Sequence, residues 1–307
     1  MIKAGIIGGS NPMAGELIRL LINHPDVEIM WVDSARYTGR LVSDVHHGLL
    51  GETSLRISPS GNNRLDEIDA LFIFRQRGQT IEWLEQHPVP EGLRIIDLSV
   101  DMRDSHNAQA WNFVYGLPEL SRKALVRGAT RAIVPHPAAM LAELALLPMA
   151  KAGRLRSAIT VRLSPAALGE QPDDLQAIAA EVRLALSELQ PDVPEIEMSV
   201  DPSGDDRVMT ATVAFDTTDD IGDAMRDYEE FYDDHSFTFV VSNELSPKEV
   251  AGTNKCLLRL DKGDGRIEIS ATMDALLKGA AGTGVHDMNL LFGLAERVGL
   301  ALKASKF

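Results

Sequence analysis

The sequence is poor in cysteine, carries no excess of positive charge and has no long apolar run. Cys256 is the single cysteine among 307 residues, which excludes a disulfide within the chain and a thiolate metal cluster. Lys and Arg number 30 against 45 Asp and Glu, so the formal net charge is −15. Because so acidic a surface repels phosphate backbones and anionic lipids, we expect neither a nucleic-acid partner nor a membrane partner.

Targeting and membrane signals are also missing from the pattern. The segment from Met1 to Gly8 holds a short apolar run that leads directly into a glycine turn, unlike a signal peptide. No segment approaches the roughly 18 to 20 apolar residues that a membrane span needs. We therefore expect a cytoplasmic protein. His46 and His47 are adjacent but lack the carboxylate or cysteine neighbours of a metal site, so we expect no metal.

The first 135 residues alternate between strand and helix patterns. Short buried apolar runs are typical of strands, and apolar residues at helical spacing are typical of amphipathic helices. The predicted elements are strands at 3–9, 27–32, 70–74 and 94–98 and helices at 14–23 and 79–86. This alternation predicts an α/β fold with a Rossmann-type parallel sheet that is covered by helices on both faces.

After Pro135 the pattern changes to that of an α+β unit. The predicted elements are strands at 157–163, 198–200, 208–215, 237–241, 255–260 and 267–273, helices at 138–152 and 171–190, an acidic exposed helix at 218–233, and a last helix at 285–298. We predict a Rossmann NADP-binding-type domain at 1–135 and 284–307. An α+β catalytic and dimerisation-type domain at 136–283 completes the chain.

A glycine turn follows the first strand and is the main candidate for binding a dinucleotide. The candidate residues are Gly8, Gly9, Ser10, Asn11, Pro12 and Met13. Glycines allow the backbone to approach a pyrophosphate, and the next helix offers free N–H groups. Asn11 stands where a glycine is expected, although Asn tolerates a positive φ better than most residues, and Pro12 removes one N–H group but suits a first helical turn. The alternative is a turn that no longer binds a cofactor.

Two further loops could contact such a cofactor. After the second strand, Ser34 and Arg36 suit an adenosine 2′-phosphate and therefore NADP, whereas Asp33 would suit a free ribose hydroxyl. After the third strand, Arg77 and Gly78 could face the phosphates, or the arginine could simply be solvated. Both choices remain open at this point.

Ser99 lies at the carboxyl end of the fourth strand, where ligands of open α/β sheets gather. With Asp101 and Arg103 it could position a ligand. The same residues could equally cap the turn that follows the strand.

Over nearly its whole length the chain resembles the N-acetyl-γ-glutamyl-phosphate reductase family of semialdehyde-dehydrogenase-like enzymes. The motifs that carry the resemblance are Met1–Leu21, Val42–His46, Ile96–Arg103, Val114–Arg122 and a C-terminal block of Asp274–Gly282 and Met288–Leu294. The resemblance implies a Rossmann domain, an α+β dimerisation domain and a C-terminal helix that returns to the first domain. It also implies a homo-oligomer, a dimer or a tetramer.

The same resemblance implies NADPH-dependent reduction of an acyl phosphate to a semialdehyde in arginine biosynthesis. The family route runs through a thioester on a cysteine, with a histidine as acid and base. Asn289, in the C-terminal block, is then a candidate contact for the cofactor or another anion.

At the active-site positions the chain departs from the family pattern. Pro137 stands where the nucleophilic cysteine is expected, and Ile178 stands where the catalytic histidine is expected. The glycine-rich loop is reduced to Ser164–Gly169, followed by an apparent deletion. Because thioester chemistry needs a thiolate, we predict that no catalytic residue of the family is intact. His136 and Cys256 are the two groups that could substitute, and we expect Cys256, in a strand beyond the pocket, to be structural.

Three interpretations remain. The chain could be a divergent NADP-dependent acyl-phosphate reductase. It could be a non-catalytic member, a pseudoenzyme that binds a small molecule or pairs with an active paralogue. It could also transfer hydride directly without a nucleophile, with His136 as the acid. The second interpretation is favoured, because the segments that form the fold keep ordinary strand and helix patterns while the catalytic residues of the family are replaced.

Overall fold

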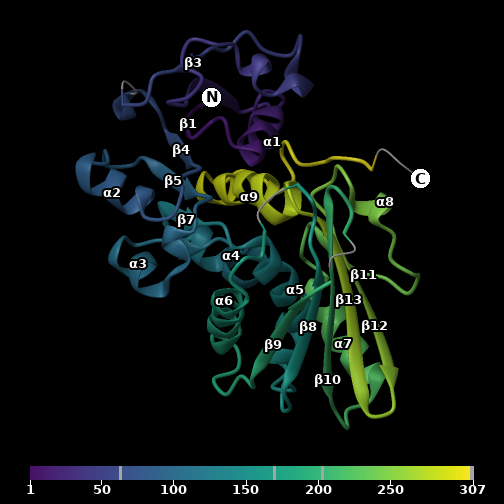
Figure 1. The fold of residues 1–307 in the computed structure, drawn as a ribbon. Coiled ribbons are helices and arrows are strands. Elements are labelled where there is room, and N and C mark those ends of the chain that lie inside the picture. The colour runs from purple at the N-terminus through teal and green to yellow at the C-terminus, as the bar shows by residue number, and fades with distance from the viewer. Residues whose placement is uncertain (62–63, 169–170, 202–203, 305–307) are drawn as a thin grey trace. The chain divides into compact units, whose positions relative to one another are not determined.

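The chain forms two compact units, each built around its own β-sheet (Figure 1). The first unit contains Met1–Pro135 and Ala280–Ala301, and the second contains His136–Gly279 and the residues after Ala301. The predicted domain boundary at residue 284 stays a prediction. The parts of the chain that the computed structural model describes are residues 1–61, 64–168, 171–201 and 204–304.

The sheet of the first unit has seven parallel strands in the order β3-β2-β1-β4-β5-β7-β6. These strands are β1 (Ile2–Ile7), β2 (Val27–Asp33), β3 (Ile57–Ser58), β4 (Ala70–Ile73), β5 (Arg94–Asp97), β6 (Val114–Tyr115) and β7 (Arg131–Ile133). β4 is buried along its whole length, as expected for a parallel sheet covered on both faces. The strand order reverses between β1 and β4, and ligands of such sheets bind at this point, beyond the carboxyl ends of the strands.

Helices of the first unit come from both ends of the sequence. They are α1 (Pro12–Leu21), α2 (Gln79–Gln86), α3 (Ser105–Ala110), α4 (Pro118–Val126) and α9 (Gly282–Leu291). The apolar face of α1 buries Leu17, Ile18 and Leu21 completely. Helix α9 packs against α1, α4 and β5, which confirms the predicted return of the C-terminal helix to the first unit (Figure 1).

The predicted C-terminal helix is too long, because α9 ends at Leu291 instead of Val298. Gly293 adopts φ +69°, a left-handed conformation that terminates helices. The Asn289 amide then donates to the carbonyl oxygens of Glu296 (3.2 Å) and Val298 (2.9 Å). The following turns therefore fold back onto the helix and partly bury side chains whose spacing resembles that of a helix.

The sheet of the second unit is mixed and has six strands in the order β11-β12-β13-β10-β8-β9. These strands are β8 (Ile159–Ser164), β9 (Ile196–Val200), β10 (Val208–Asp216), β11 (Thr238–Val240), β12 (Cys256–Gly263) and β13 (Arg266–Asp274). The central pair β10 and β13 is antiparallel, with Met209 opposite Met273 and Val213 opposite Ile269. These four side chains are fully buried and belong to the core of the unit.

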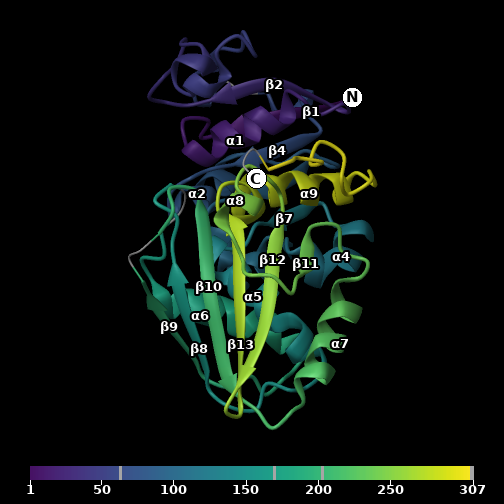
Figure 2. The same ribbon diagram turned by 90° about the vertical axis from the view of Figure 1, so that its right-hand side faces the viewer.

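Helices α5, α6 and α7 pack against one face of this sheet, as Figure 2 shows from the opposite face. The helices of the second unit are α5 (Pro137–Lys151), α6 (Leu175–Ser187), α7 (Ile221–Tyr232) and α8 (Pro247–Val250). Helix α5 is buried on all sides up to Ala150 and forms the centre of the core. Helix α7 is acidic on one side, but Tyr228, Phe231 and Tyr232 bury its other side, so the prediction of an exposed helix is only half right.

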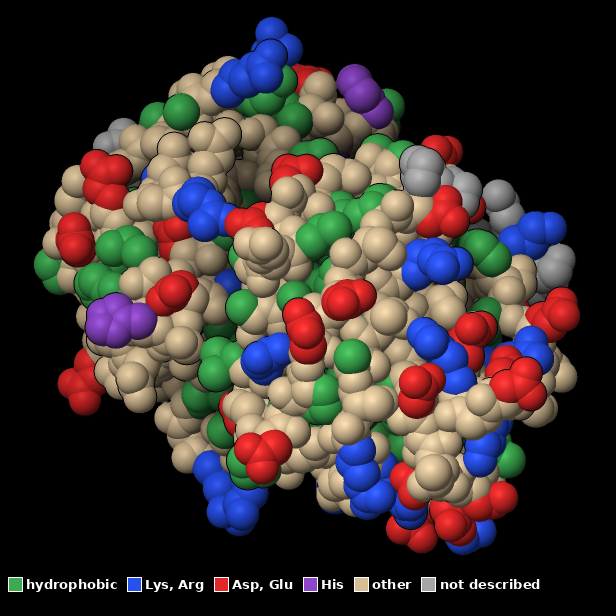
Figure 3. Space-filling model, turned by 60° about the horizontal axis from the view of Figure 1, so that its bottom comes forward, with side chains coloured by type: hydrophobic (Ala, Val, Ile, Leu, Met, Phe, Trp, Pro, Cys, Tyr) green, Lys and Arg blue, Asp and Glu red, His purple; other side chains and the backbone are tan. Residues whose placement is uncertain are grey.

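Charged side chains of both signs lie on the surface of the molecule (Figure 3). On the face drawn in Figure 3, acidic and basic side chains are interspersed and do not gather into one basic patch. Within the described parts of the chain, no helix has both the length and the apolar character needed to cross a membrane.

Candidate functional site

The glycine turn connects β1 to α1 at the point where the strand order reverses. Gly8 adopts φ +79°, and a Cβ atom there would lie 1.9 Å from the carbonyl oxygen of Phe74. Only glycine fits, because the turn and the end of β4 approach each other backbone to backbone. The turn thus has the location and the close backbone approach that a dinucleotide site requires.

The hydrogen bonds of this turn are largely made within the protein. The N–H of Gly8 donates to Asp33 Oδ1 (2.9 Å), and the N–H of Gly9 donates to the Asp33 carbonyl oxygen (2.8 Å). The N–H of Met13 donates to Asn11 Oδ1 (2.9 Å), so Asn11 caps helix α1. Asn11 has φ −67°, so the expectation that Asn replaces glycine here through a positive φ is wrong. Its role is the N-cap, which needs an extended backbone.

Asp33 is buried and accepts hydrogen bonds from two N–H groups of the glycine turn. Burial raises the pKa of the Asp33 carboxyl, and its hydrogen bond from Gly8 and the charge of Arg75 oppose that rise. Next to it, Ser34 Oγ lies 3.1 Å from Ser10 Oγ. The Arg36 guanidinium is exposed and lies 5.2 Å from the centre of the Tyr37 ring. The Asp33 carboxyl therefore binds the turn, and Ser34 and Arg36 stay the predicted contacts of a 2′-phosphate in this loop.

His46 also secures the turn. Its Nε2 atom lies 2.7 Å from the Gly9 carbonyl oxygen, and a Cβ atom on Gly15 would lie 2.5 Å from its Nδ1 atom. The ring thus packs between the turn and the first turn of α1. In the described residues, no group of three or more metal-ligating side chains comes together.

The loop after β4 places Arg77 in solvent and Gly78 at the start of α2. Asp101 caps that helix by accepting from the N–H groups of Gly78 (2.5 Å) and Thr80 (2.8 Å). Of the two predicted roles for Asp101, the geometry therefore supports capping. No observation tests Arg77 and Gly78 as cofactor contacts, so these stay predictions.

A buried carboxyl lies at the carboxyl end of β5. Asp97 Oδ2 accepts from Ser99 Oγ (2.9 Å), and Asp97 Oδ1 accepts from the Ser99 N–H (3.0 Å). Complete burial raises the Asp97 pKa to about 7, and these hydrogen bonds and the charge of Arg103 limit the rise. The sequence identified Ser99 at this strand end but not the shifted acid that it contacts.

Asn289 is fully engaged in structural contacts. Besides its two bonds to the turns after α9, its Oδ1 atom lies 3.1 Å from His24 Nε2. His24 is buried, and burial lowers its pKa. Asn289 as a cofactor contact stays a prediction, while its structural role accounts for the shape of the C-terminal segment.

In the second unit, the candidate positions meet at the start of α5. The His136 N–H donates to Glu181 Oε1 (3.0 Å), and His136 Nδ1 accepts from the Ala138 N–H (3.1 Å). Pro137 is the first residue of the helix, and a Cβ atom on Gly279 would lie 3.2 Å from its Cβ atom. Pro137, at the position where the resemblance places the nucleophile, therefore forms a packed apolar contact.

Ile178 lies on α6, one helical turn before Glu181. The two residues share a helix face, and Glu181 binds the backbone at the start of α5. Ile178 is 4% exposed and offers no group that could transfer a proton. Helices α5 and α6, which carry Pro137 and Ile178, pack against each other within this unit, and the catalytic assignment of these two positions stays a prediction.

Sequence reasoning missed a polar cluster at the end of β13. Asp274 Oδ2 accepts from Arg207 Nε (2.5 Å) and from the Gly252 N–H (2.8 Å), while Oδ1 accepts from the N–H groups of Leu276 and Leu277. Burial raises the Asp274 pKa, and Arg207 opposes the rise. An Asp directly before a turn is the sequence signal that could have indicated this cap.

Gly169, the end of the shortened loop, lies outside the described residues.

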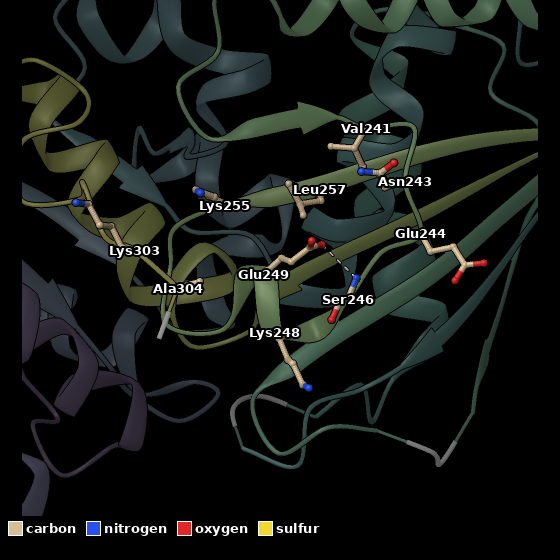
Figure 4. A pocket seen from close by; sticks show the side chains of 10 residues that line it. All are labelled: Val241, Asn243, Glu244, Ser246, Lys248, Glu249, Lys255, Leu257, Lys303 and Ala304. Atoms are coloured by element: carbon tan, nitrogen blue, oxygen red, sulfur yellow. Dashed lines mark hydrogen bonds between the residues drawn. The ribbon is translucent and has the colours of Figure 1, made fainter. Parts of the chain in front are cut away.

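A pocket of about 650 Å³ lies elsewhere in the second unit (Figure 4). It is lined by Val241, Asn243, Glu244, Ser246, Lys248, Glu249, Lys255, Leu257, Lys303 and Ala304. In Figure 4 the side chains of Lys248 and Lys303 point away from each other, while Glu249 turns back to the Ser246 N–H (3.4 Å). None of the predicted site residues lines this pocket.

The parallel sheet with its switch-point turn and the mixed second sheet define the class of dinucleotide-binding, semialdehyde-dehydrogenase-like proteins. Residues 3–127 match the family "Semialdehyde dehydrogenase, NAD binding domain". The fold is similar to the crystal structure of aspartate semialdehyde dehydrogenase II from Vibrio cholerae, with a TM-score of 0.70 and 14% identity over 95% of this chain and 98% of that chain. It is also similar to the NADP-bound aspartate semialdehyde dehydrogenase from Candida albicans, with a TM-score of 0.68 and 11% identity over 97% and 99%.

Sequence relatives are closer. The chain is 41% identical to the N-acetyl-gamma-glutamyl-phosphate reductase of Parabacteroides distasonis and 38% identical to that of Bacteroides thetaiotaomicron, in each case over 100% of both chains. The chain therefore belongs to the N-acetyl-γ-glutamyl-phosphate reductase family. The first alignment spans 327 positions, 20 more than the 307 residues of this chain, so this chain lacks residues that the relative has.

Proposed function

We propose that this chain is a member of the reductase family of arginine biosynthesis that has lost the thioester route and acts as a non-catalytic or catalytically impaired relative. The observation that carries the proposal is Pro137 at the first position of α5. A proline side chain has no nucleophilic atom, so it cannot hold the acyl group while hydride arrives. Ile178, at the expected position of the base, cannot move a proton either.

The two candidate replacement groups of the chain offer little nucleophilicity. Cys256 is completely buried in β12, where it lies opposite Met273 in the strand pair. His136 is 6% exposed, and its Nδ1 lone pair already accepts a hydrogen bond from the Ala138 N–H. Removal of a nucleophile alone typically lowers the rate by roughly 10⁴- to 10⁶-fold, so turnover by the family route is expected to be undetectable.

The experiment is a turnover assay in the direction of aldehyde oxidation. Purified protein is incubated with N-acetylglutamate semialdehyde, inorganic phosphate and NADP, and NADPH formation is followed at 340 nm, where reduced nicotinamide absorbs. We expect no phosphate-dependent signal above the protein-free rate, with an active relative such as the Parabacteroides distasonis protein as positive control. A turnover near the roughly 10 s⁻¹ of ordinary enzymes would refute the proposal.

Two variants identify the source of any residual turnover. Cys256→Ala removes the single thiol, and His136→Asn removes the imidazole while it keeps a side chain that can cap α5. Loss of a residual rate in Cys256→Ala alone would assign a thioester route to this buried cysteine. Loss in His136→Asn alone would support direct chemistry with His136 as the acid.

For the cofactor, we propose that the turn of the first unit retains a site for NADP. The match of residues 3–127 to an NAD-binding domain supports a dinucleotide, and Ser34 and Arg36 provide groups suited to a 2′-phosphate. The tight approach at Gly8 supports the same location. When bound, NADPH would supply hydride, while the chain would hold the phosphates and the adenosine. Calorimetric titration with NADPH and NADH tests this site, and tighter NADPH binding is the expected result.

For partners, we propose a homo-oligomer formed through the open face of the second sheet. This face carries neutral hydroxyl side chains along its centre, at Thr210, Thr212 and Ser270. Charged side chains of both signs flank this centre, among them Arg162 and Glu268. A face with both signs is complementary to a second copy of itself in an isologous pair.

Sedimentation analysis of the wild type and of Thr212→Lys tests this proposal. We expect a dimer or larger for the wild type and a smaller species for the variant, since a lysine at the centre would meet its own copy. A wild-type monomer that associates only with an active paralogue would replace the homo-oligomer with a mixed one.

A further inference from the structure

We propose that the Asn11 side chain acts as an internal ligand at the start of α1, occupying a hydrogen-bond donor that a dinucleotide diphosphate would use, and that it thereby limits the affinity for NADP. This inference rests on the proposed cofactor site. It concerns the strength of that site and the residue that sets it.

The donors of the turn are the first part of the argument. The N-terminal N–H groups of a helix have no partner within the helix and are the groups that bind phosphates. Here Pro12 has no N–H, and the Met13 N–H is held by Asn11 Oδ1 at 2.9 Å. The Gly8 N–H and the Gly9 N–H are held by Asp33. An incoming diphosphate must therefore displace the Asn11 side chain before it gains the Met13 N–H as a donor.

The Asn11 side chain is the part of this arrangement that can yield. Its bond spans only two residues, and the side chain is partly exposed. By contrast, the bonds of Gly8 and Gly9 come from the buried Asp33, and the His46 ring packs against the turn from the other side. At the Met13 N–H, a diphosphate thus competes with a single amide oxygen of the protein.

Electrostatics gives the direction of the effect. The amide oxygen of Asn11 is only partly negative, whereas a diphosphate is fully charged and gains more from the positive end of a helix. Replacement by glycine would free the Met13 N–H, and glycine is itself tolerated at the N-cap with little loss of stability. Replacement by aspartate would keep the cap and place a full negative charge where the phosphate must bind.

The test is calorimetric titration of NADPH into the wild type, Asn11→Gly and Asn11→Asp, with inorganic pyrophosphate as a second titrant. We expect about tenfold tighter NADPH binding for Asn11→Gly and about tenfold weaker binding for Asn11→Asp, with the same order for pyrophosphate. Asp220→Gly serves as the matched control, because Asp220 caps α7 through a bond of the same kind to the Gly222 N–H (2.7 Å). Its NADPH affinity should equal that of the wild type.

Thermal unfolding of the same variants separates this role from a structural one. A residue that only stabilises α1 would lose stability and affinity together in Asn11→Gly, whereas the proposal requires affinity to rise while stability falls slightly. Equal or weaker NADPH binding by Asn11→Gly overturns the role of Asn11 but leaves the cofactor site intact. Failure of both the wild type and Asn11→Gly to bind NADPH overturns this inference and the cofactor proposal together.

Discussion

The helices α1 and α5 begin in the same way. In each, a proline occupies the first helical position, and the residue before it accepts a hydrogen bond from the N–H two residues later. Asn11 Oδ1 does so with Met13 (2.9 Å), and His136 Nδ1 does so with Ala138 (3.1 Å). The resemblance places the cofactor turn at the first of these starts and the nucleophile at the second. At both starts, a side chain of the protein accepts a hydrogen bond from an N–H group that could otherwise donate to a ligand or an oxyanion.

The surroundings of the two starts differ. The α1 start is partly exposed and has the hydroxyl groups of Ser10 and Ser34 beside it. At the α5 start, by contrast, Pro137 packs against Gly279, and the backbone is anchored to the buried Glu181. The first can exchange a side chain for a ligand, whereas the second is part of a core. This difference supports the proposal that the chain retains a cofactor site while it has lost the thioester route.

We expect the largest difference between the two regions in the pH dependence of stability. Its source is Asp97, which lies at the same edge of the parallel sheet as the start of α1. Its pKa is raised from 3.8 to about 7 in the folded chain, so the folded state retains a proton that the unfolded state has lost. The contribution of Asp97 to stability is then fully present below pH 4 and falls by roughly 4 kcal/mol as pH rises to 7. Asp97→Asn should remove this fall.

Urea unfolding at several pH values, followed by tryptophan fluorescence, measures this dependence. All three tryptophans, Trp31, Trp83 and Trp111, lie in the first unit, so the signal reports on that unit alone. Equal slopes for wild type and Asp97→Asn between pH 4 and 7 would show that the buried acid is not the source.

The next largest effect compares a glycine from each region. Gly8→Ala must place a Cβ atom 1.9 Å from the Phe74 carbonyl oxygen at φ +79°, and we expect a loss of about 3 kcal/mol. Gly279→Ala meets Pro137 Cβ at 3.2 Å and the flexible Met273 Cε at 3.3 Å, so about 1 kcal/mol is expected. Urea unfolding monitored by circular dichroism gives both values. A larger loss for Gly279→Ala than for Gly8→Ala would show that the backbone approach at Gly8 is not the tighter of the two contacts.

A smaller effect tests the anchor of the α5 start. Glu181→Leu leaves the buried His136 N–H without its acceptor, at an expected cost of about 2 kcal/mol. Glu181→Gln keeps an oxygen at the same position and serves as the control, with at most half of that loss. If Leu and Gln cost the same in urea unfolding, the hydrogen bond does not anchor the helix.

The smallest effect concerns the caps themselves. Asn11→Ala and His136→Ala each remove one N-cap bond and should each lower stability by about 1 kcal/mol. Asn11→Gly should lose only a few tenths of a kcal/mol, because glycine lets water reach the freed N–H. Thermal unfolding by calorimetry provides the comparison. No loss in His136→Ala would mean that Glu181 alone secures the second start.

Much of the fold could be predicted from periodicity. Helix α2 has the predicted limits, and β10 differs from its prediction by one residue. The two-residue strand β3 was missed, because so short an edge strand leaves no periodic signal. The C-terminal helix was predicted too long, because Gly293 and the Asn289 bonds end it while side-chain spacing continues.

The sequence by itself determined the parallel sheet and the second α+β unit, and it shows Pro137 and Ile178, whereas the loss of a cysteine and a histidine at these positions stays a prediction. These depend on local periodicity and residue identity, which a single chain displays directly. Only the tertiary structure decided which donors remain available to a ligand. Asp33 meets Gly8 from 25 residues away, and Glu181 meets His136 from 45 residues away. Such pairs are set by packing between distant segments, and no local pattern encodes them.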